Sequence, residues 1–362
     1  MQTIQFGGLF HLRAGYCIKL ALLLTSALPF VYLYLYKSFH KEQHRGISFG
    51  DQGPSSTKPN DTKEIIVPPP AGPLLTMFTT WPANDREHTV RNNTLKNWAK
   101  LKPHVRPVFF SCNMKEANDI IQHGWEVLPV SKTAALGVPV LKYMFLDAIR
   151  RFKSNFYAYS NGDILFDEGL INTLRTVVSA YFPPTNPILI TGQRTNVQNV
   201  TAAEATKMER LSTIAKQRGK LFITLAEDYF ITDSTFPWGK IPGIVIGRPA
   251  YDNWLVLNSC KHDHTVIDAT ATILAAHQTT KVGNYEGTTR RSTNFNFGLL
   301  YGLYRTVKYT AGSTSCAPLV SNRNETGIYI SRRTRFSRSC YHFYRLFGNR
   351  TKLDSVPASK NK

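Results

Sequence analysis

Short apolar runs alternate with amphipathic stretches from Leu74 onward. The apolar runs have the length and composition of buried strands, and the stretches between them repeat their apolar residues at helical spacing. The runs that predict strands are Leu74–Trp81, Val105–Ser111, Trp125–Val130, Phe156–Phe166, Pro187–Gly192, Tyr229–Thr232 and Ile244–Ile246, and those that predict helices are Asn84–Leu101, Ala117–His123, Pro139–Phe152 and Ala202–Arg218. The alternation predicts an α/β fold, with a mostly parallel sheet and helices on both faces.

One apolar run near the N-terminus stands apart from this pattern. Leu20–Tyr36 holds seventeen residues without a charge, with three tyrosines at one end. This length just crosses a hydrocarbon core, and tyrosine rings favour the membrane interface. A cleavable signal peptide and a buried core helix are the alternatives, but no small-residue cleavage site follows the run. We therefore expect a cytoplasmic tail at residues 1–19 and a single transmembrane helix at residues 20–36.

The next segment, residues 37–73, is rich in Ser, Pro, Gly, Lys and Asp and predicts a stem. Charges on the two sides of the anchor do not decide its orientation. Five N-x-Ser/Thr sequons follow the anchor, at Asn60, Asn92, Asn199, Asn324 and Asn349. Together they favour a glycosylated, lumenal domain. We expect a type II protein of the Golgi or another secretory-pathway membrane, with its main domain at residues 74–320.

Charge and cysteine content add two expectations. The net charge is +20, and residues 328–353 carry six Arg, one Lys and no acid. This basic extension, residues 321–362, would attract phosphates, acidic glycans or anionic lipid, or would simply be solvated. A lumenal domain would not meet nucleic acid. Beyond the anchor the cysteines are Cys112, Cys260, Cys316 and Cys340, and we expect Cys316 to pair with Cys340, the alternative being four buried thiols.

Polar residues end one of the predicted strands at Asn161-Gly162-Asp163. Ligands of parallel α/β sheets bind beyond the carboxyl ends of the strands. Gly162 permits close approach of a ligand, and Asp163 suits Mg²⁺ or Mn²⁺, which prefer oxygen ligands. The alternative is a simple turn.

A second group of polar residues lies farther along the chain. Asp228 directly precedes a strand, and Arg248, Asp252, Asn253 and Trp254 fall within one short segment. Arg248 suits phosphate oxygens. Asp252 suits a base or a contact to a sugar hydroxyl, and Trp254 suits either sugar stacking or the core.

Four segments in this order resemble a little-characterised family of the nucleotide-diphospho-sugar transferase superfamily: SNGDILF, AEDYFIT, IPGIVIGRPAYDNWLV and VIDATATILAAHQ. The resemblance covers roughly Leu74 to Gln278. It implies a GT-A-like fold, a nucleotide-sugar donor and a divalent metal. Asn161 and Asp163 occupy the place of the family's D-x-D motif, and His277 occupies the place of a later metal ligand. The chain departs from the pattern in having Asn161 for the first Asp and Gly162 where relatives usually have Ala.

The resemblance also makes Asp228 and Asp252 candidates for acceptor activation, with Asn253 and Trp254 beside the substrate. We therefore expect a membrane-anchored glycosyltransferase that moves a sugar from a nucleotide-sugar donor to a glycan or glycoprotein acceptor, using Mn²⁺ or Mg²⁺. The alternative is a non-catalytic lumenal glycan-binding protein on the same fold. The chain has no Walker or G-x-G-x-x-G motif, which argues against P-loop enzymes and dinucleotide-dependent dehydrogenases. A nucleotidyltransferase is disfavoured because the loop after the first strand lacks clustered Gly, Arg and Lys.

Overall fold

The computed structural model describes residues 72–340, apart from 83–86, 114–116 and 281–288. The chain divides into two units, Met1–Val67 and Pro68–Lys362, and only the second contains described residues. The predicted tail and anchor and almost all of the stem lie outside the described residues. Within the described part of the chain, no helix is both long and apolar enough to cross a membrane.

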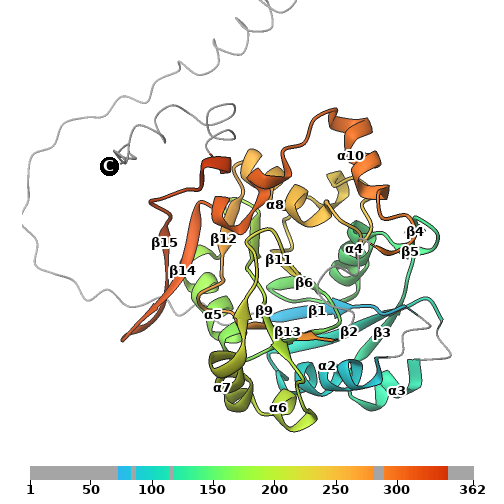
Figure 1. Ribbon diagram of the computed structural model, residues 1–362, viewed down its shortest axis with the longest axis vertical. Coiled ribbons are helices and arrows are strands. Elements are labelled where there is room, and N and C mark those ends of the chain that lie inside the picture. Colours follow the sequence, from blue (N-terminus) through green and yellow to red (C-terminus); the bar gives the residue numbers. More distant parts are fainter. Residues whose placement is uncertain (1–71, 83–86, 114–116, 281–288, 341–362) are drawn as a thin grey trace, which may run out of the picture. The chain divides into compact units, whose positions relative to one another are not determined.

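The domain is organised around a nine-stranded sheet (Figure 1), whose strand order is β15-β14-β12-β8-β11-β6-β1-β2-β3. The strands are β1 (Leu75–Thr79), β2 (Val105–Ser111), β3 (Glu126–Pro129), β6 (Phe156–Ser160), β8 (Ile188–Thr191), β11 (Tyr229–Asp233), β12 (Thr265–Asp268), β14 (Leu319–Asn324) and β15 (Gly327–Arg332). β11 runs antiparallel to both neighbours, and β15 runs antiparallel to β14. The other five pairings are parallel, so the predicted mostly parallel sheet is confirmed.

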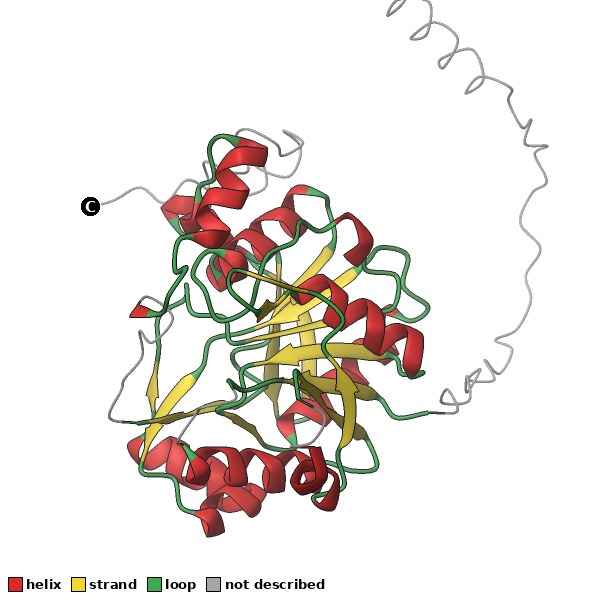
Figure 2. Ribbon diagram, turned by 90° about the vertical axis from the view of Figure 1, so that its right-hand side faces the viewer, coloured by secondary structure: helices red, strands yellow, loops and turns green. Residues whose placement is uncertain are grey.

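Helices cover both faces of this sheet, as Figure 2 shows. Side chains alternate along each strand, so Phe156 and Ala158 of β6 enter one core and Tyr157 and Tyr159 enter the other. The helices packed on the first face are α2 (His88–Lys100), α3 (Ala117–Gln122) and α5 (Gly169–Tyr181), and those on the second are α4 (Leu141–Arg151) and α8 (Tyr251–Lys261). The expected helices on both faces are confirmed.

A smaller four-stranded sheet has the order β10-β9-β13-β7. Its strands are β7 (Ile164–Phe166), β9 (Thr195–Gln198), β10 (Lys220–Leu221) and β13 (Ala275–Thr279), and it packs against α6 (Ala202–Thr206) and α7 (Met208–Arg218). The remaining elements are β4 (Thr133–Ala134), β5 (Val138–Pro139), η2 (Trp238–Lys240), α10 (Phe295–Tyr304), η3 (Tyr309–Gly312) and η4 (Thr314–Cys316). β13 pairs with β7. This pairing places the end of the segment VIDATATILAAHQ beside the turn that follows β6.

Three predicted elements differ from the structure. The run Phe156–Phe166 is two strands, because a tight turn separates β6 from β7. The predicted helix Ala202–Arg218 is two helices, because α6 ends before Lys207 and α7 begins after it. Ile244–Ile246 is not a strand: Val245 makes only an isolated bridge to Val140, and the segment is buried as a loop. Its apolar residues pack against the core and do not indicate pairing in a sheet.

The C-terminal part of the described chain belongs to the domain. β14 crosses the expected boundary at residue 320, and its hairpin with β15 completes the sheet, so residues 321–332 are not a separate extension. Arg333 then pairs with Asp268 at the end of β12, with Nη2 2.6 Å from Oδ2.

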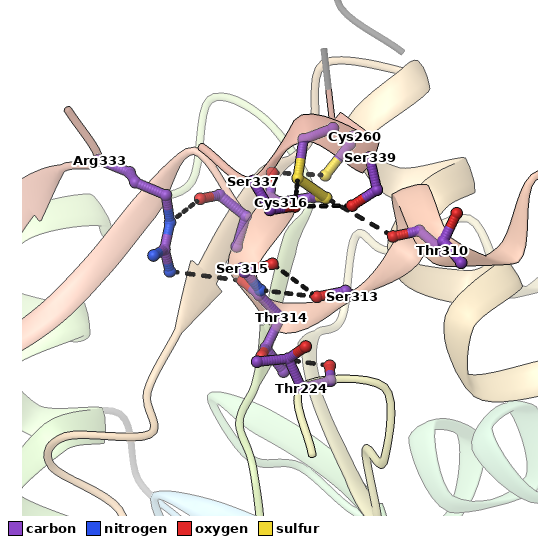
Figure 3. Close-up of a disulfide and its surroundings, with 12 residues drawn as sticks. Thr224, Cys260, Thr310, Ser313, Thr314, Ser315, Cys316, Arg333, Ser337 and Ser339 are labelled. Atoms are coloured by element: carbon purple, nitrogen blue, oxygen red, sulfur yellow. Dashed lines mark hydrogen bonds between the residues drawn. A yellow bond between two sulfur atoms is a disulfide. The ribbon is translucent and has the colours of Figure 1, made fainter. Parts of the chain in front are cut away.

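A disulfide closes this region. It joins Cys316 to Cys340, as predicted, and lies beside the buried thiol of Cys260 (Figure 3). Burial raises the pKa of the Cys260 thiol to about 12, so this thiol stays protonated at neutral pH. Cys112 is free and exposed.

Candidate functional site

The strand order of the large sheet reverses between β1 and β6. The chain passes from β1 to β2 and β3 on one side, and β6 then pairs with the opposite side of β1. Such a reversal of strand order opens a crevice at the carboxyl edge, where ligands of open α/β sheets bind. The residues that follow β6 directly are Asn161, Gly162 and Asp163. The predicted tripeptide therefore lies at the switch point of the sheet.

Asn161 is tied to Asp228 by two hydrogen bonds. Because β11 is antiparallel to β6, its first residue pairs with the last residue of β6, and Asp228 lies at the same edge. The Asn161 backbone N–H donates to the Asp228 carbonyl at 2.9 Å, and Asn161 Nδ2 donates to Asp228 Oδ1 at 2.6 Å. The Tyr159 hydroxyl donates to Asn161 Oδ1 at 3.0 Å. Both ends of the Asn161 amide are therefore engaged, and its nitrogen donates to a carboxylate.

Arg194 completes this network. Its Nη1 lies 2.7 Å from Asp228 Oδ2, and the residue is only 5% exposed. Asp228 thus receives a guanidinium on one oxygen and an amide on the other. Sequence reasoning missed Arg194, although it follows the predicted strand Pro187–Gly192 by two residues, at a carboxyl end where site residues were expected.

Asp163 and His277 converge, as a shared metal site would require. His277 pairs with Ile164 across β13 and β7, and its Nε2 lies 3.2 Å from Asp163 Oδ2. Thr279 Oγ1 lies 3.1 Å from the other ring nitrogen of His277. Burial would raise the pKa of Asp163, but His277, with a smaller contribution from Arg194, holds it below its usual range. Asp163 is therefore ionised at neutral pH.

These two side chains fit a divalent cation. Asp163 Oδ1 is buried and has no hydrogen-bond partner, so one carboxylate oxygen remains free for a cation. Mg²⁺ commonly takes one or two carboxylates and fills its remaining positions with phosphate oxygens and water. Across the described ranges, no group of three or more His, Cys, Asp and Glu residues is arranged to hold a metal ion. A cation bound here would thus depend on ligands from substrate or solvent.

Gly162 is required by the packing of Trp81. A Cβ at residue 162 would lie 2.0 Å from Trp81 Nε1, which donates to the Gly162 carbonyl at 3.2 Å. Thr94 of α2 donates to the same carbonyl at 2.8 Å. The departure from Ala at this position is therefore matched by an indole that occupies the space of the missing methyl group.

Asp252 lies in the first turn of α8 with a raised pKa. Burial, together with the nearby charge of Asp228, raises the pKa of Asp252 to about 7, and its Oδ1 has no hydrogen-bond partner. Burial and the charges of Asp252 and Asp228 also raise the pKa of Glu227 well above its usual range. Asn253 Nδ2 donates to Glu227 Oε2 at 2.8 Å and to the Leu225 carbonyl at 3.0 Å. Asn253 thus connects α8 to the segment that carries Asp228.

Two residues that were predicted to contact the substrate, Arg248 and Trp254, contact other residues of the chain. Arg248 donates from Nε to the Arg291 carbonyl at 2.9 Å and from Nη1 to the Gly247 carbonyl at 2.7 Å. Trp254 is 3% exposed and stacks on Tyr304, with ring centroids 5.7 Å apart. Of the two roles suggested for this indole, the structure places it in the core.

No family model and no curated protein sequence matches the chain. Among solved structures, the mannosyltransferase PcManGT from Pyrobaculum calidifontis in complex with GDP-Man and Mn²⁺ is 12% identical, with 72% of this chain and 68% of that chain covered and a TM-score of 0.35. Glucosyl-3-phosphoglycerate synthase from Mycobacterium tuberculosis in complex with Mg²⁺ and uridine diphosphate is 11% identical, with coverage of 59% and 74% and a TM-score of 0.31. CMP:2-keto-3-deoxy-manno-octonic acid synthetase with CTP is 6% identical, with coverage of 57% and 90% and a TM-score of 0.31. The chain is similar to these three solved structures at 6–12% identity, with TM-scores of 0.31–0.35.

Proposed function

We propose that this chain is a glycosyltransferase that uses a nucleotide-sugar donor. The observation that supports it most is the meeting of Asp163, His277 and the Asn161–Asp228 pair at the switch point of the sheet. A diphosphate needs a cation beside it, and Asp163 offers an ionised carboxylate with one free oxygen for that cation. The further proposals are that the acceptor is a glycan or glycoprotein and that residues 20–36 anchor the chain with this domain in the lumen of the Golgi or another secretory compartment.

Donor binding in this proposal divides between two sets of side chains. Asp163 and His277 would hold Mn²⁺ or Mg²⁺, which offsets the charge that develops on a diphosphate leaving group. Asn161 and Asp228 are held in one geometry by their mutual hydrogen bond and by Arg194, so the carboxyl edge is rigid before the donor arrives. Gly162 lets the Trp81 indole pack against this turn and so contributes to the same fixed geometry.

Acceptor activation is assigned to Asp252. A general base works best when its pKa is near the working pH, and the pKa of Asp252 is about 7. Its free Oδ1 can accept the proton of an acceptor hydroxyl as that oxygen attacks the sugar. In neighbouring Glu227, burial and the charges of Asp252 and Asp228 raise the pKa and so favour the protonated form, which is not a base.

The test is nucleoside diphosphate release from a panel of nucleotide sugars, with Mn²⁺, Mg²⁺ or chelator, by the purified full-length chain. Asp163→Ala and His277→Ala should each lower metal-supported turnover at least about 100-fold, the usual scale for loss of one preorganised electrostatic group. Asp119→Asn is the matched control, because Asp119 lies on α3. This helix connects β2 to β3 at one end of the large sheet. The control variant should retain full turnover.

Two outcomes would contradict the proposal. Equal turnover by Asp163→Ala and wild type would remove the cation site. Binding of acidic or neutral glycans in calorimetry, with no binding of any nucleotide sugar, would instead identify a glycan-binding protein. Nucleoside triphosphates belong in the same panel, because release of pyrophosphate from one of them would indicate a nucleotidyltransferase.

A further inference from the structure

Three of the five sequons lie within the described residues, at Asn92, Asn199 and Asn324. The sequence treats them alike, but the structure places them in three different settings. An N-linked oligosaccharide is bulky and hydrophilic, so the folded chain can carry one only where the Asn side chain reaches solvent. The settings therefore distinguish the sequons.

Asn92 is in the second turn of α2 and is itself partly exposed, but the fold uses the rest of its sequon for packing. Asn93 and Thr94, the other two residues of the sequon, are 1% and 0% exposed. The Thr94 hydroxyl donates to the Val90 and Gly162 carbonyls, and the second of these belongs to the site turn. A glycan on Asn92 would stand next to residues that must be buried for the site to form.

Asn199 is exposed, but its sequon is also in use. Its backbone has a φ of 51°, and its carbonyl accepts from Arg218 at 3.4 Å. The Thr201 hydroxyl caps α6, accepting from the Glu204 N–H at 3.3 Å and donating to Glu204 Oε2 at 2.9 Å. The hydroxyl of this sequon is therefore directed to a helix end and away from the Asn side chain.

Asn324 has the opposite arrangement at the exposed turn of the β14–β15 hairpin. Asn324, Glu325 and Thr326 are all exposed. Asn324 Oδ1 accepts from the Thr326 N–H at 3.0 Å, from the Thr326 hydroxyl at 2.8 Å and from the Gly327 N–H at 3.1 Å. These bonds form an Asx turn, in which the amide oxygen is held while the side chain as a whole is exposed.

We propose that Asn324 carries an N-linked oligosaccharide and that Asn92 does not. The step is a group transfer from a lipid-diphosphate-linked oligosaccharide, catalysed by the oligosaccharide transferase of the host compartment. Asn324 Nδ2 attacks the anomeric carbon, so a C–N bond forms. The bond from that carbon to the diphosphate oxygen breaks, the electron pair leaves with the lipid diphosphate, and the released lipid diphosphate takes up the proton that the nitrogen loses. The inference rests on the lumenal placement proposed above.

The place of Asn324 suggests what its glycan does. β15 is an outermost strand of the nine-stranded sheet, and Tyr329 on it is 44% exposed. Edge strands present unpaired backbone groups to other chains and are protected in natural proteins by charge or by covering groups. A glycan at the hairpin turn would shield this edge, where a glycan on α2 would lie far from it.

The experiment expresses the full chain in eukaryotic cells with an additional sequon appended after Lys362, which reports whether the C-terminal side reaches the lumen. Wild type, Asn324→Gln, Thr326→Ala and Thr326→Ser are compared by gel mobility before and after peptide N-glycosidase. Asn92→Gln is the matched control, and Asn199→Gln allows the remaining exposed sequon to be counted. Mass spectrometry of deglycosylated peptides in heavy water identifies each modified Asn.

The expected result is the loss of one glycan in Asn324→Gln and in Thr326→Ala, its retention in Thr326→Ser, and unchanged mobility of Asn92→Gln. If the appended sequon is modified but Asn324 is not, the inference is wrong while the lumenal placement holds. A glycan found on Asn92 of the folded protein would overturn the inference equally. If the appended sequon and Asn324 are both unmodified, the placement is wrong and the inference falls with it.

Discussion

Substitution of Asn161 by Asp would restore the first carboxylate of the D-x-D pattern, and the structure predicts that the fold resists it. The new carboxylate oxygen would replace Nδ2, which now donates to Asp228 Oδ1 at 2.6 Å. The hydrogen bond would be lost and two like charges would face each other. Arg194 on the opposite oxygen of Asp228 offsets only part of this repulsion.

The variant can keep both carboxylates charged or can bind one proton. The response that costs less free energy sets the loss of stability. Two like unit charges at this separation repel by about 6 kcal/mol at an effective dielectric constant of about 20. Uptake of one proton at pH 7 by a carboxyl with an ordinary pKa costs about 4 kcal/mol. The pair will therefore share a proton, as other close carboxylate pairs do. The free energy of unfolding should fall by up to about 4 kcal/mol at pH 7, but only by about 1.5 kcal/mol at pH 5.

The sign of the pH dependence follows from proton linkage. Asn161→Asp raises the folded-state pKa of the pair above its unfolded value, so the folded variant binds more protons between these two values. Its stability is therefore greatest at acidic pH and is lost as pH rises through the raised pKa. Urea denaturation of wild type and variant at pH 5 and pH 7.5 measures this difference.

Asn161→Ala is the control, because it removes the same hydrogen bond and adds no charge. It should cost about 1.5–3 kcal/mol at either pH, the usual loss for a hydrogen bond to a charged group. Equal destabilisation of Asn161→Asp at both pH values would refute the reasoning. The reasoning would also be refuted if Asn161→Asp were as stable as wild type at pH 7.5. That result would mean that Asp228 can move away from the new carboxylate.

Three further predictions concern activity and stability. For the proposed base Asp252, kcat/KM should fall about tenfold per pH unit below its pKa of about 7, and a profile flat down to pH 5 would exclude it as the base. Gly162→Ala should destabilise the protein by about 1–3 kcal/mol through its clash with Trp81, whereas Gly239→Ala, with no atom within 4 Å, should not. Cys340→Ser should lower the free energy of unfolding by about 3.5 kcal/mol, because a disulfide spanning a sequence separation of 24 no longer restricts the unfolded chain, and an unchanged denaturation midpoint would contradict this.

Much of the sheet was predictable because each of these strands is visible as a short pattern in the sequence. β1, β2 and β3 are short, mostly apolar runs separated by helices, and each parallel pairing follows from that alternation. The run Ile244–Ile246 has the same composition but no neighbouring strand to pair with along its length, so its burial was mistaken for strand formation. Apolar runs identify what is buried, and only the tertiary structure decides whether the backbone pairs.

The site was only partly predictable for the same reason. Asp163 lies in the turn after β6, and its role was inferred from that position together with the family resemblance. Its proximity to His277 depends on the pairing of β13 with β7, and the Asn161–Asp228 bond depends on β11 running antiparallel to β6. These contacts join residues far apart in the chain, and no local pattern encodes them. Trp254 suited both the core and sugar stacking in the sequence, and only the tertiary structure shows that it is buried.

The order of the strands has a consequence for synthesis of the chain. The half of the sheet formed by β1, β2, β3 and β6 is complete once residue 160 has been made. β8 is made soon afterwards, but its neighbours β11 and β12 come about forty and about seventy-five residues later, and β14 and β15 last of all. At a synthesis rate of roughly 5–20 residues per second, β8 waits several seconds with both edges open. The emerging chain therefore passes through a stage in which half of its sheet is formed and a central strand still lacks both partners, and protection from aggregation matters most at that stage.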